Sequence, residues 1–163
     1  MEKQKKESSR GMGVIEVIVV IAVVAGSFFA ISQLSSVYIA YSSNKIDTDN
    51  AINLAAEGIE GLRALRDSSW TNNIANKTIG ATYYLTISGS NWSITNTDPG
   101  AINGVYSRTI LFSRVYRDLN DNIASAGTED TNIIKATVSV SWMESTGLQN
   151  VSLDTYLSNF RNN

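Results

Sequence analysis

The stretch GMGVIEVIVVIAVVAGSFFAI, residues 11–31, is an apolar run with a single carboxylate, Glu16, near its start. The next charged residue is Lys45, so the segment is long enough to cross a bilayer as a helix at about 1.5 Å per residue. A charge at the centre of a membrane costs on the order of 2.5–3.5 kcal/mol, and such residues usually have a specific partner. We therefore expect Glu16 to have a defined role.

The composition excludes several classes of chemistry. The chain contains no cysteine and no histidine. Disulfides, thiol nucleophiles, Cys-ligated zinc, a lipid-modified cysteine, the Ser-His-Asp triad and the HExxH metal site are all excluded, and we expect no enzyme activity. The 163 residues correspond to one domain plus its anchor. A long N-terminal helix would leave roughly a hundred residues, enough for a small core.

The charges are distributed unevenly between the first 11 residues and the remainder. This leader holds four basic and two acidic residues: Lys3, Lys5, Lys6, Arg10, Glu2 and Glu7. A basic flank before an apolar run places the N-terminus in the cytoplasm and the rest outside. The remainder has 9 basic and 13 acidic residues. This balance argues against a broad nucleic-acid surface, although it leaves a role in DNA uptake open.

The junction between the leader and the apolar run resembles the type IV prepilin motif. That motif is a basic leader ending in Gly, a hydrophobic residue after the cut, and a Glu four residues further on; here these are Gly11, Met12 and Glu16. The resemblance implies that a prepilin peptidase removes residues 1–11 and that the new N-terminal amine of Met12 is methylated. It also implies that Glu16 serves in filament assembly.

The spacing of Met12 and Glu16 also has a physical rationale. Four residues of helix rise by about 6 Å, so a neighbouring helix displaced by that rise can pair its free amine with this carboxylate. Within a bundle of apolar helices, such a pair relieves two expensive buried charges and fixes the register. We therefore interpret Glu16 as a docking group rather than a catalyst.

We expect the transmembrane or filament-core helix of residues 12–41 to continue as an amphipathic helix over residues 42–67. The apolar stripe of this continuation is predicted to lie against a sheet and comprises Ile52, Ala55, Ile59, Leu62 and Leu65. Gly58 and Gly61 each cost about 1 kcal/mol of helix stability relative to Ala, so we expect them to serve close packing. Residues 51–63, AINLAAEGIEGLR, resemble PilV-type minor pilins and the I-type pseudopilins of type II secretion.

Residues 68–163 are expected to form a globular antiparallel sheet domain. After a polar connection over 68–77, the hydrophobic period changes from helical to alternating. The predicted strands are residues 82–88, 91–95, 105–117, 134–142 and 151–157, with a hairpin at Ser145-Thr146-Gly147 before the last one. The expected fold is therefore α+β: a pilin fold whose long N-terminal helix, transmembrane in its first half, packs on a small antiparallel sheet.

The strand over 105–117 carries apolar residues on both faces, which predicts a central strand partly covered on each side. One face would hold Tyr106, Arg108, Ile110 and Phe112, and the other Val105, Thr109, Leu111 and Val115. In the strand over 134–142, Trp142 falls in the apolar phase and is predicted to fill the core.

One loop has the oxygen spacing of a calcium site. Asp118, Asn120, Asn122 and Glu129 fall at loop positions 1, 3, 5 and 12. Position six is Ile123, where the sharp turn of a calcium loop requires Gly, and strands rather than helices flank the segment. A solvated polar loop and a calcium site both remain open, and no other cofactor is expected.

The resemblance implies a structural subunit, a minor pilin or pseudopilin, of a type IV pilus or related filament. Such a subunit waits in the cytoplasmic membrane as a single-pass protein and then joins a pilus or a periplasmic or cell-surface filament. Its partners would be other pilin or pseudopilin subunits, a prepilin peptidase, an inner-membrane assembly platform and membrane lipid. Pilus, type II secretion and competence systems are not distinguished. The alternative is a membrane-anchored extracytoplasmic binding domain that never enters a filament; a plain anchor or a secretory signal peptide leaves Glu16 unexplained.

Overall fold

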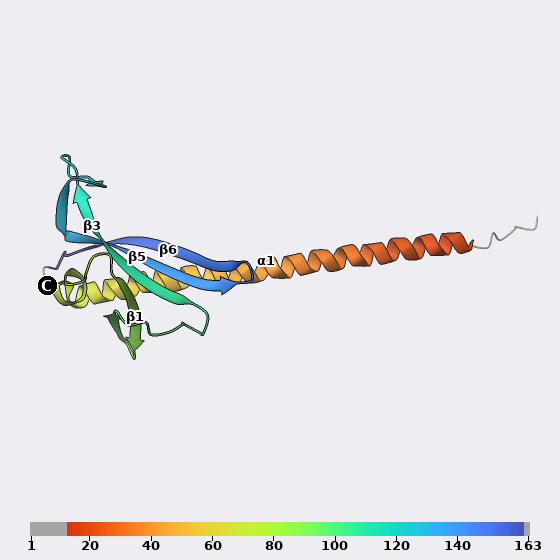
Figure 1. Cartoon of the computed structure of the whole chain (residues 1–163), viewed down its shortest axis with the longest axis horizontal. Helices are drawn as coiled ribbons and strands as arrows, with labels where there is room; N and C mark the ends of the chain where they lie inside the picture. The colour runs from red at the N-terminus through yellow and green to blue at the C-terminus, as the bar shows by residue number, and fades with distance from the viewer. Residues whose placement is uncertain (1–12, 162–163) are drawn as a thin grey trace, which may run out of the picture. The chain divides into compact units, whose positions relative to one another are not determined.

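The structure, a computed structural model, describes residues 13–161, apart from the side chains of residues 40, 43 and 44. The elements are helix α1 (Val14–Ser68), a π-helical turn η1 (Thr71–Ala75), and the strands β1 (Thr82–Ser88), β2 (Asn91–Thr95), β3 (Ser107–Arg117), β4 (Ile123–Ala124), β5 (Thr128–Glu144) and β6 (Gly147–Ser158) (Figure 1). A long apolar helix followed by an open antiparallel sheet confirms the α+β class. The chain divides into two compact units, of which the first ends at Ser43 and the second is Asn44–Asn163.

The first unit is described by the N-terminal part of α1. Its segment Val14–Ile39 is long and apolar enough to cross a membrane, and none of that segment is buried. The helix is continuous because the chain's single proline, Pro99, lies far downstream and the β-branched residues here are tolerated in a helix this long. Its start at Val14 and end at Ser68 agree with the predicted helix within two residues.

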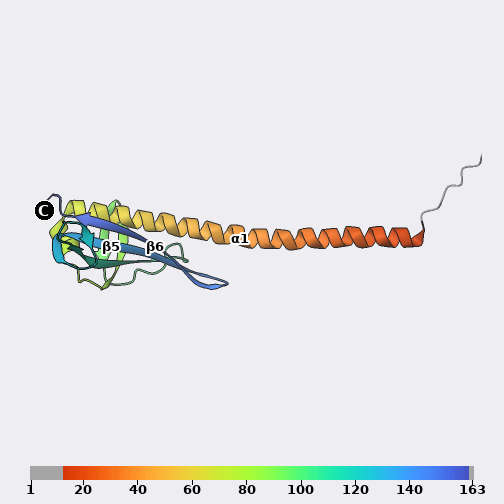
Figure 2. The same cartoon turned by 90° about the horizontal axis from the view of Figure 1, so that it is seen from above.

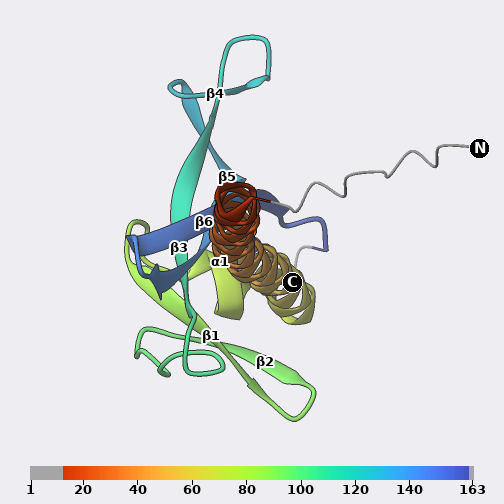
Figure 3. The ribbon, with the colours of Figure 1, turned by 90° about the vertical axis from the view of Figure 1, so that its right-hand side faces the viewer.

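The second unit contains one sheet with the strand order β2-β1-β3-β5-β6, and β4 pairs with β3 outside this path. All the pairings are antiparallel. The predicted bounds of β1 and β2 are confirmed, and β3 is central in the order. The predicted hairpin is also confirmed: Glu144 pairs with Gly147, so Ser145 and Thr146 form the turn. Figure 3 shows the β1–β2 hairpin and the β4 segment at opposite sides of this unit.

One face of the sheet packs on the part of α1 that belongs to the second unit (Figure 2). The buried helix residues are Ala51, Ala55, Leu62 and Leu65, and the buried sheet residues include Ile110, Phe112, Val138, Val140, Trp142 and Leu157. The prediction for Trp142 is therefore confirmed. The prediction for Ile52 is wrong, since 41% of its surface is exposed and Ala51 takes the buried position beside Ala55. The buried face of the helix includes alanines and glycines, because these small residues let the helix approach the sheet closely.

The predicted role of Gly58 and Gly61 in close packing is confirmed. A Cβ atom on Gly58 would lie 2.9 Å from Cγ1 of Val138 on β5, and one on Gly61 would lie 2.9 Å from the ring of Trp92 on β2. Contacts this short cannot be accommodated without movement of a neighbour. The two glycines lower the intrinsic stability of the helix, but they permit its close approach to the sheet.

The predicted faces of β3 are confirmed in part, because the face with Tyr106, Arg108, Ile110 and Phe112 is buried. Arg114 pairs with Ile134 and Tyr116 with Glu129, so the extra residues, 130–133, lie in β5 opposite Val115. Val115 is only 3% exposed and lines a hollow together with Ile123, Ala124 and Lys135, so it is covered on the second face of β3, as predicted. Val105 and Leu111, predicted to lie on a covered second face, are exposed. Helix α1 thus covers one face of the sheet, and the other face is open at Val105 and Leu111.

The connection over residues 68–77 is also different from the prediction. Trp70 and Ile74 are buried in the core, and the turn η1 lies between the helix and the sheet. The many Asn and Ser residues of this segment are exposed or bonded locally, for example Asn73 Nδ2 to the carbonyl oxygen of Leu65 at 2.9 Å. Trp70 and Ile74 are thus the two residues of this polar segment that belong to the hydrophobic core.

Candidate functional site

The assembly site predicted from the sequence begins at the first turn of α1. Glu16 lies in this turn, its side chain is exposed, and its backbone N–H donates to the carbonyl oxygen of Gly13 at 2.9 Å. Gly11 and Met12, the predicted processing and methylation positions, lie outside the described residues. Within Val14–Ile39, Glu16 is the single charged side chain on a predominantly apolar surface.

The hydroxyl groups along this helix are satisfied within the helix itself. Ser27, Ser32, Ser35 and Ser36 each donate to the carbonyl oxygen four residues earlier, at 2.8, 2.9, 3.0 and 3.0 Å. Such internal bonds remove the cost of placing a hydroxyl in an apolar medium. The helix can therefore present small serine positions to lipid or to another helix without an unpaired donor from these four residues.

Tyr38 and Tyr41 lie at the C-terminal end of this apolar segment, and both side chains are 69% exposed. Aromatic residues with a polar tip are enriched where a membrane helix meets water. Their position after the apolar run therefore gives the segment an interfacial end, and Lys45 is the next charged residue along the chain.

Two of the predicted calcium ligands, Asp118 and Glu129, have partners within the protein. Asp118 accepts hydrogen bonds from the backbone N–H groups of Asn120 and Asn122 at 2.8 and 2.9 Å, and its other oxygen accepts from the amide of Asn122. Glu129, the fourth predicted ligand, forms an ion pair with Arg114 on β3 instead. The backbone bonds hold the pKa of Asp118 below its usual value.

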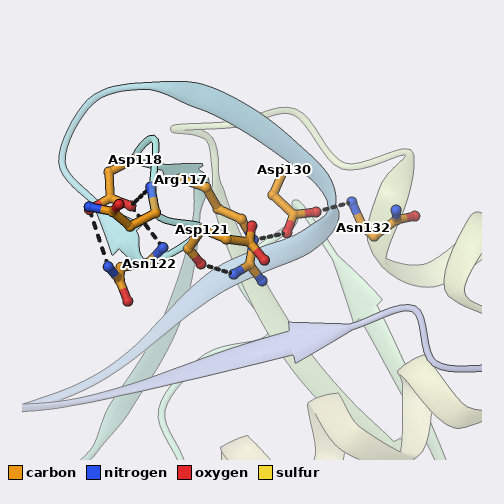
Figure 4. Close-up of polar contacts among 7 residues, drawn as sticks. Arg117, Asp118, Asp121, Asn122, Asp130 and Asn132 are labelled. Carbon is orange, nitrogen blue, oxygen red and sulfur yellow. Dashed lines mark hydrogen bonds and ion pairs between the residues drawn. The ribbon is translucent and has the colours of Figure 1, made fainter.

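A guanidinium lies among the acidic groups of this loop (Figure 4). Nε of Arg117 pairs with Asp130 at 2.7 Å and lies 3.5 Å from Asp121. The hydrogen bond from Arg117 lowers the pKa of Asp130, and Asp130 in turn raises the pKa of Arg117. Over residues 13–161, no group of three or more acidic side chains is placed to hold a metal ion. Calcium at this loop stays a prediction, and Arg117 offsets only part of the negative charge of Asp118, Asp121 and Asp130.

A buried arginine is the main polar feature that the sequence reasoning did not single out. The Arg108 side chain is only 6% exposed; its Nη1 donates to the carbonyl oxygen of Leu54 at 2.9 Å and lies 3.7 Å from Glu57. The guanidinium carbon is 5.5 Å from the centre of the Trp92 ring. Burial lowers the pKa of Arg108, and the Glu57 carboxylate opposes this shift. The signal in the sequence was a cation in the buried phase of β3.

The C-terminal residues return to the end of α1. The guanidinium carbon of Arg66 lies 4.8 Å from the centre of the Phe160 ring, and Arg161 Nη1 donates to the carbonyl oxygen of Asp67 at 3.3 Å. Arg66 also bonds to Asp67, which lowers the pKa of that carboxyl group. These contacts fix the direction of β6 relative to the helix end within the second unit.

The described hollows of the second unit are open and polar. A hollow of about 490 Å³ between the segment after η1 and the start of β5 is lined by Lys77, Thr78, Arg114, Glu129 and Asp130 among others. Arg114 and Glu129 neutralise one another in it. The arrangement offers neither a nucleophile with a base nor an enclosed apolar pocket.

The chain was compared with protein-family models, with curated proteins and with solved structures, and none of them matches it.

Proposed function

We propose that this chain is a structural subunit, a minor pilin or pseudopilin, of a type IV pilus or related filament. The observation that carries the proposal is the helical segment Val14–Ile39, which is strongly apolar, exposed along its length, and carries one charged side chain, Glu16, in its first turn. A soluble protein would bury such a surface. The apolar surface of this segment must therefore be removed from water by a bilayer, by a bundle of similar helices, or first by one and then by the other.

In this proposal the leader of residues 1–11 is removed after Gly11, and Met12 becomes the new N-terminus with a methylated amine. The subunit then waits in the cytoplasmic membrane with the Asn44–Asn163 unit outside, an orientation favoured by the basic leader. Prepilin peptidase and an inner-membrane assembly platform are the implied partners.

Assembly transfers the apolar helix from lipid to a bundle of other pilin or pseudopilin helices. The two environments are similarly apolar, so the transfer itself supplies little driving force. Register must then come from specific contacts, and Glu16 with the free amine of a neighbouring subunit supplies one. Gly26 allows close approach, because a Cβ there would meet nothing within 4 Å and a neighbouring helix can occupy that space.

The second candidate is an anchored extracytoplasmic binding domain that keeps its leader and never enters a filament. The same membrane-spanning segment favours it. The two proposals differ at the N-terminus, because only the first requires cleavage between Gly11 and Met12.

Intact-mass and N-terminal peptide spectrometry of the membrane-bound protein separates them. The filament proposal expects a mature chain that begins at Met12 and carries the extra mass of one methyl group. The matched control is Gly11→Leu, which should retain the leader. A native chain that retains residues 1–11, or begins elsewhere, contradicts the filament proposal and favours the anchored domain.

A further inference from the structure

The turn between β5 and β6 carries an exposed apolar pair. Met143 and Leu148 lie directly opposite one another on the two strands, and 70% and 68% of their surfaces are exposed. The following pairs on the same face are polar: Ser141 with Asn150, and Ser139 with Ser152. The apolar pair is therefore confined to the tip of the hairpin.

Val105 adds a third exposed apolar side chain at this end of the sheet. Its surface is 51% exposed, and it lies two residues before Ser107, which pairs with Ser141 on β5. Together Val105, Met143 and Leu148 form what we call the hairpin-tip patch. Exposed apolar groups that gather at one place, rimmed by polar residues, are typical of surfaces that contact a protein or a membrane.

Contacts within the second unit show which end of α1 the tip lies beside. The hydroxyl of Tyr106 donates to Asp47 at 3.0 Å, and its ring lies 6.1 Å from that of Trp142, next to Met143. At the opposite end of the unit, Arg161 bonds to Asp67. The tip therefore lies at the end where α1 enters the unit, as Figure 2 shows for β5 and β6 along the helix.

The length of the connecting chain sets an upper limit on the distance between this end of the unit and the apolar segment. Eight residue steps separate Ile39, the last residue of the membrane-competent segment, from Asp47. That length spans about 12 Å as a helix and at most about 28 Å when fully extended. If residues 14–39 cross a bilayer, the hairpin-tip patch is tethered within reach of its surface.

We propose that the β5–β6 tip rests on the outer surface of the bilayer that α1 spans, with Met143 and Leu148 inserted at the lipid boundary. The turn residues Ser145 and Thr146 are uncharged, and the one carboxylate beside them, Glu144, lies in the strand phase of Trp142 rather than that of Met143 and accepts a hydrogen bond from Nε1 of Trp142 at 2.8 Å. Because α1 holds the unit at the membrane, the effective concentration of lipid is high and a weak contact suffices. The proposal rests on the membrane span and not on filament assembly.

The absence of cysteine makes the test direct, since one introduced thiol labels one position. Full-length Leu148→Cys carrying a bimane fluorophore is reconstituted in phosphatidylcholine/phosphatidylglycerol liposomes that contain nitroxide-labelled lipid. We expect a blue shift of the emission and quenching by the lipid nitroxide. Ser90→Cys is the matched control, because Ser90 is an exposed turn residue that shares a hollow with Leu65 and Ser68, away from Asp47. Equal emission and quenching at positions 148 and 90 would overturn the proposal.

A second labelling position tests whether the apolar pair causes the contact. The fluorophore is placed at Ser145→Cys, with the pair intact or changed to Met143→Gln and Leu148→Gln. We expect the double change to abolish lipid quenching while leaving the melting temperature unchanged, because both side chains are exposed. Quenching that survives the double change contradicts the proposal. A blue shift of the emission that appears only at a high density of protein in the liposomes would mean that another copy of the chain covers the hairpin-tip patch. That result would also overturn the proposal.

Neither arm requires a filament or an assembly machine. Loss of lipid contact with normal processing at Gly11 would therefore refute the tip proposal alone. A retained leader together with lipid quenching at position 148 would refute the filament proposal alone.

Discussion

Nη1 of Arg108 donates a hydrogen bond to the backbone carbonyl oxygen of Leu54 at 2.9 Å, so a cation on the central strand holds the helix that covers the sheet. The carbonyl belongs to α1 and the guanidinium to β3. The only charged partner that the described residues offer within 4.0 Å is Glu57, which remains half exposed. The contact joins the two layers of the second unit at the middle of their interface.

Replacing this arginine should cost stability in proportion to the volume lost. Arg108→Ala is expected to lower the free energy of unfolding by about 2–4 kcal/mol, because it leaves a cavity and removes a buried hydrogen bond. Arg108→Met keeps most of the volume and removes a desolvated charge, so the loss should be about 1 kcal/mol or less. Urea unfolding of the full chain in detergent, followed by tryptophan fluorescence, measures both.

The control for this comparison is Arg63→Ala. Arg63 forms an exposed pair with Glu60 within the helix, and its removal should change the free energy of unfolding by less than about 1 kcal/mol. Equal losses for Arg108→Met and Arg108→Ala would show that the charge, not the packing, holds the layers together.

Gly58→Ala should destabilise the protein although alanine is the better helix former. The propensity gain of about 1 kcal/mol is opposed by the contact of the new Cβ with Val138 at 2.9 Å. Overpacking of a core typically costs about 1–3 kcal/mol, so we expect a net loss. The measurement is the same urea titration, and Gly26→Ala is the control because a Cβ at that position meets nothing within 4 Å. A Gly58→Ala chain as stable as Gly26→Ala would contradict the observed helix–sheet distance.

The pair of Arg117 and Asp130 predicts a loss of stability in acid. Because the pKa of Asp130 in the folded protein is below its usual value of about 3.9, its contribution is fully present above that value. It is lost as the pH falls through the lower folded-state pKa. Asp130→Asn should flatten the fall in melting temperature below about pH 4. If the melting temperature of Asp130→Asn falls as steeply with decreasing pH as that of the native chain, other carboxylates determine the acid sensitivity.

The acidic loop predicts a stability effect of Asp118 that does not depend on calcium. Asp118→Ala removes the acceptor for the N–H groups of Asn120 and Asn122, so the melting temperature should fall equally in EDTA and in millimolar calcium. Differential scanning calorimetry of both proteins measures this. A rise with calcium in the native chain that disappears in Asp118→Ala would instead establish the calcium site.

Sequence periodicity predicted best those elements whose bounds depend on local sequence and not on contacts with other elements. The strands 82–88 and 91–95 and the turn at Ser145-Thr146 follow from alternation and turn residues alone, and the structure confirms them. The apolar helix is equally direct, since its length and lack of charge need no tertiary information.

The features that sequence reasoning missed depend on distances between elements. Ile52 fits a helical stripe as well as Ala51 does, and only the close approach of helix and sheet decides between them. The irregular pairing at residues 130–133 of β5 leaves no mark in the alternation of the sequence. Burial of Trp70 and of Arg108 likewise follows from which layer covers them, and a local pattern does not contain that information.

The candidate site divides in the same way. The position of Glu16 in the first turn of α1 was predictable from its spacing, whereas the ion pair of Glu129 with Arg114 was not. The spacing in the sequence fixes only the order of the candidate ligands along the chain. In the structure, β3 pairs with β5, and Glu129 on β5 accepts a hydrogen bond from Arg114 on β3.

The most direct test of the central claim is the amount of Glu16→Gln protein in filaments sheared from cells, relative to the amount in the membrane. The substitution keeps the size of the side chain and removes its charge. The account predicts that Glu16→Gln is cleaved after Gly11 and inserted in the membrane but is missing from filaments, while the control Ser27→Ala enters them, because the Ser27 hydroxyl is satisfied within its own helix. Glu16→Gln found in filaments at the native level would contradict the docking role of this carboxylate.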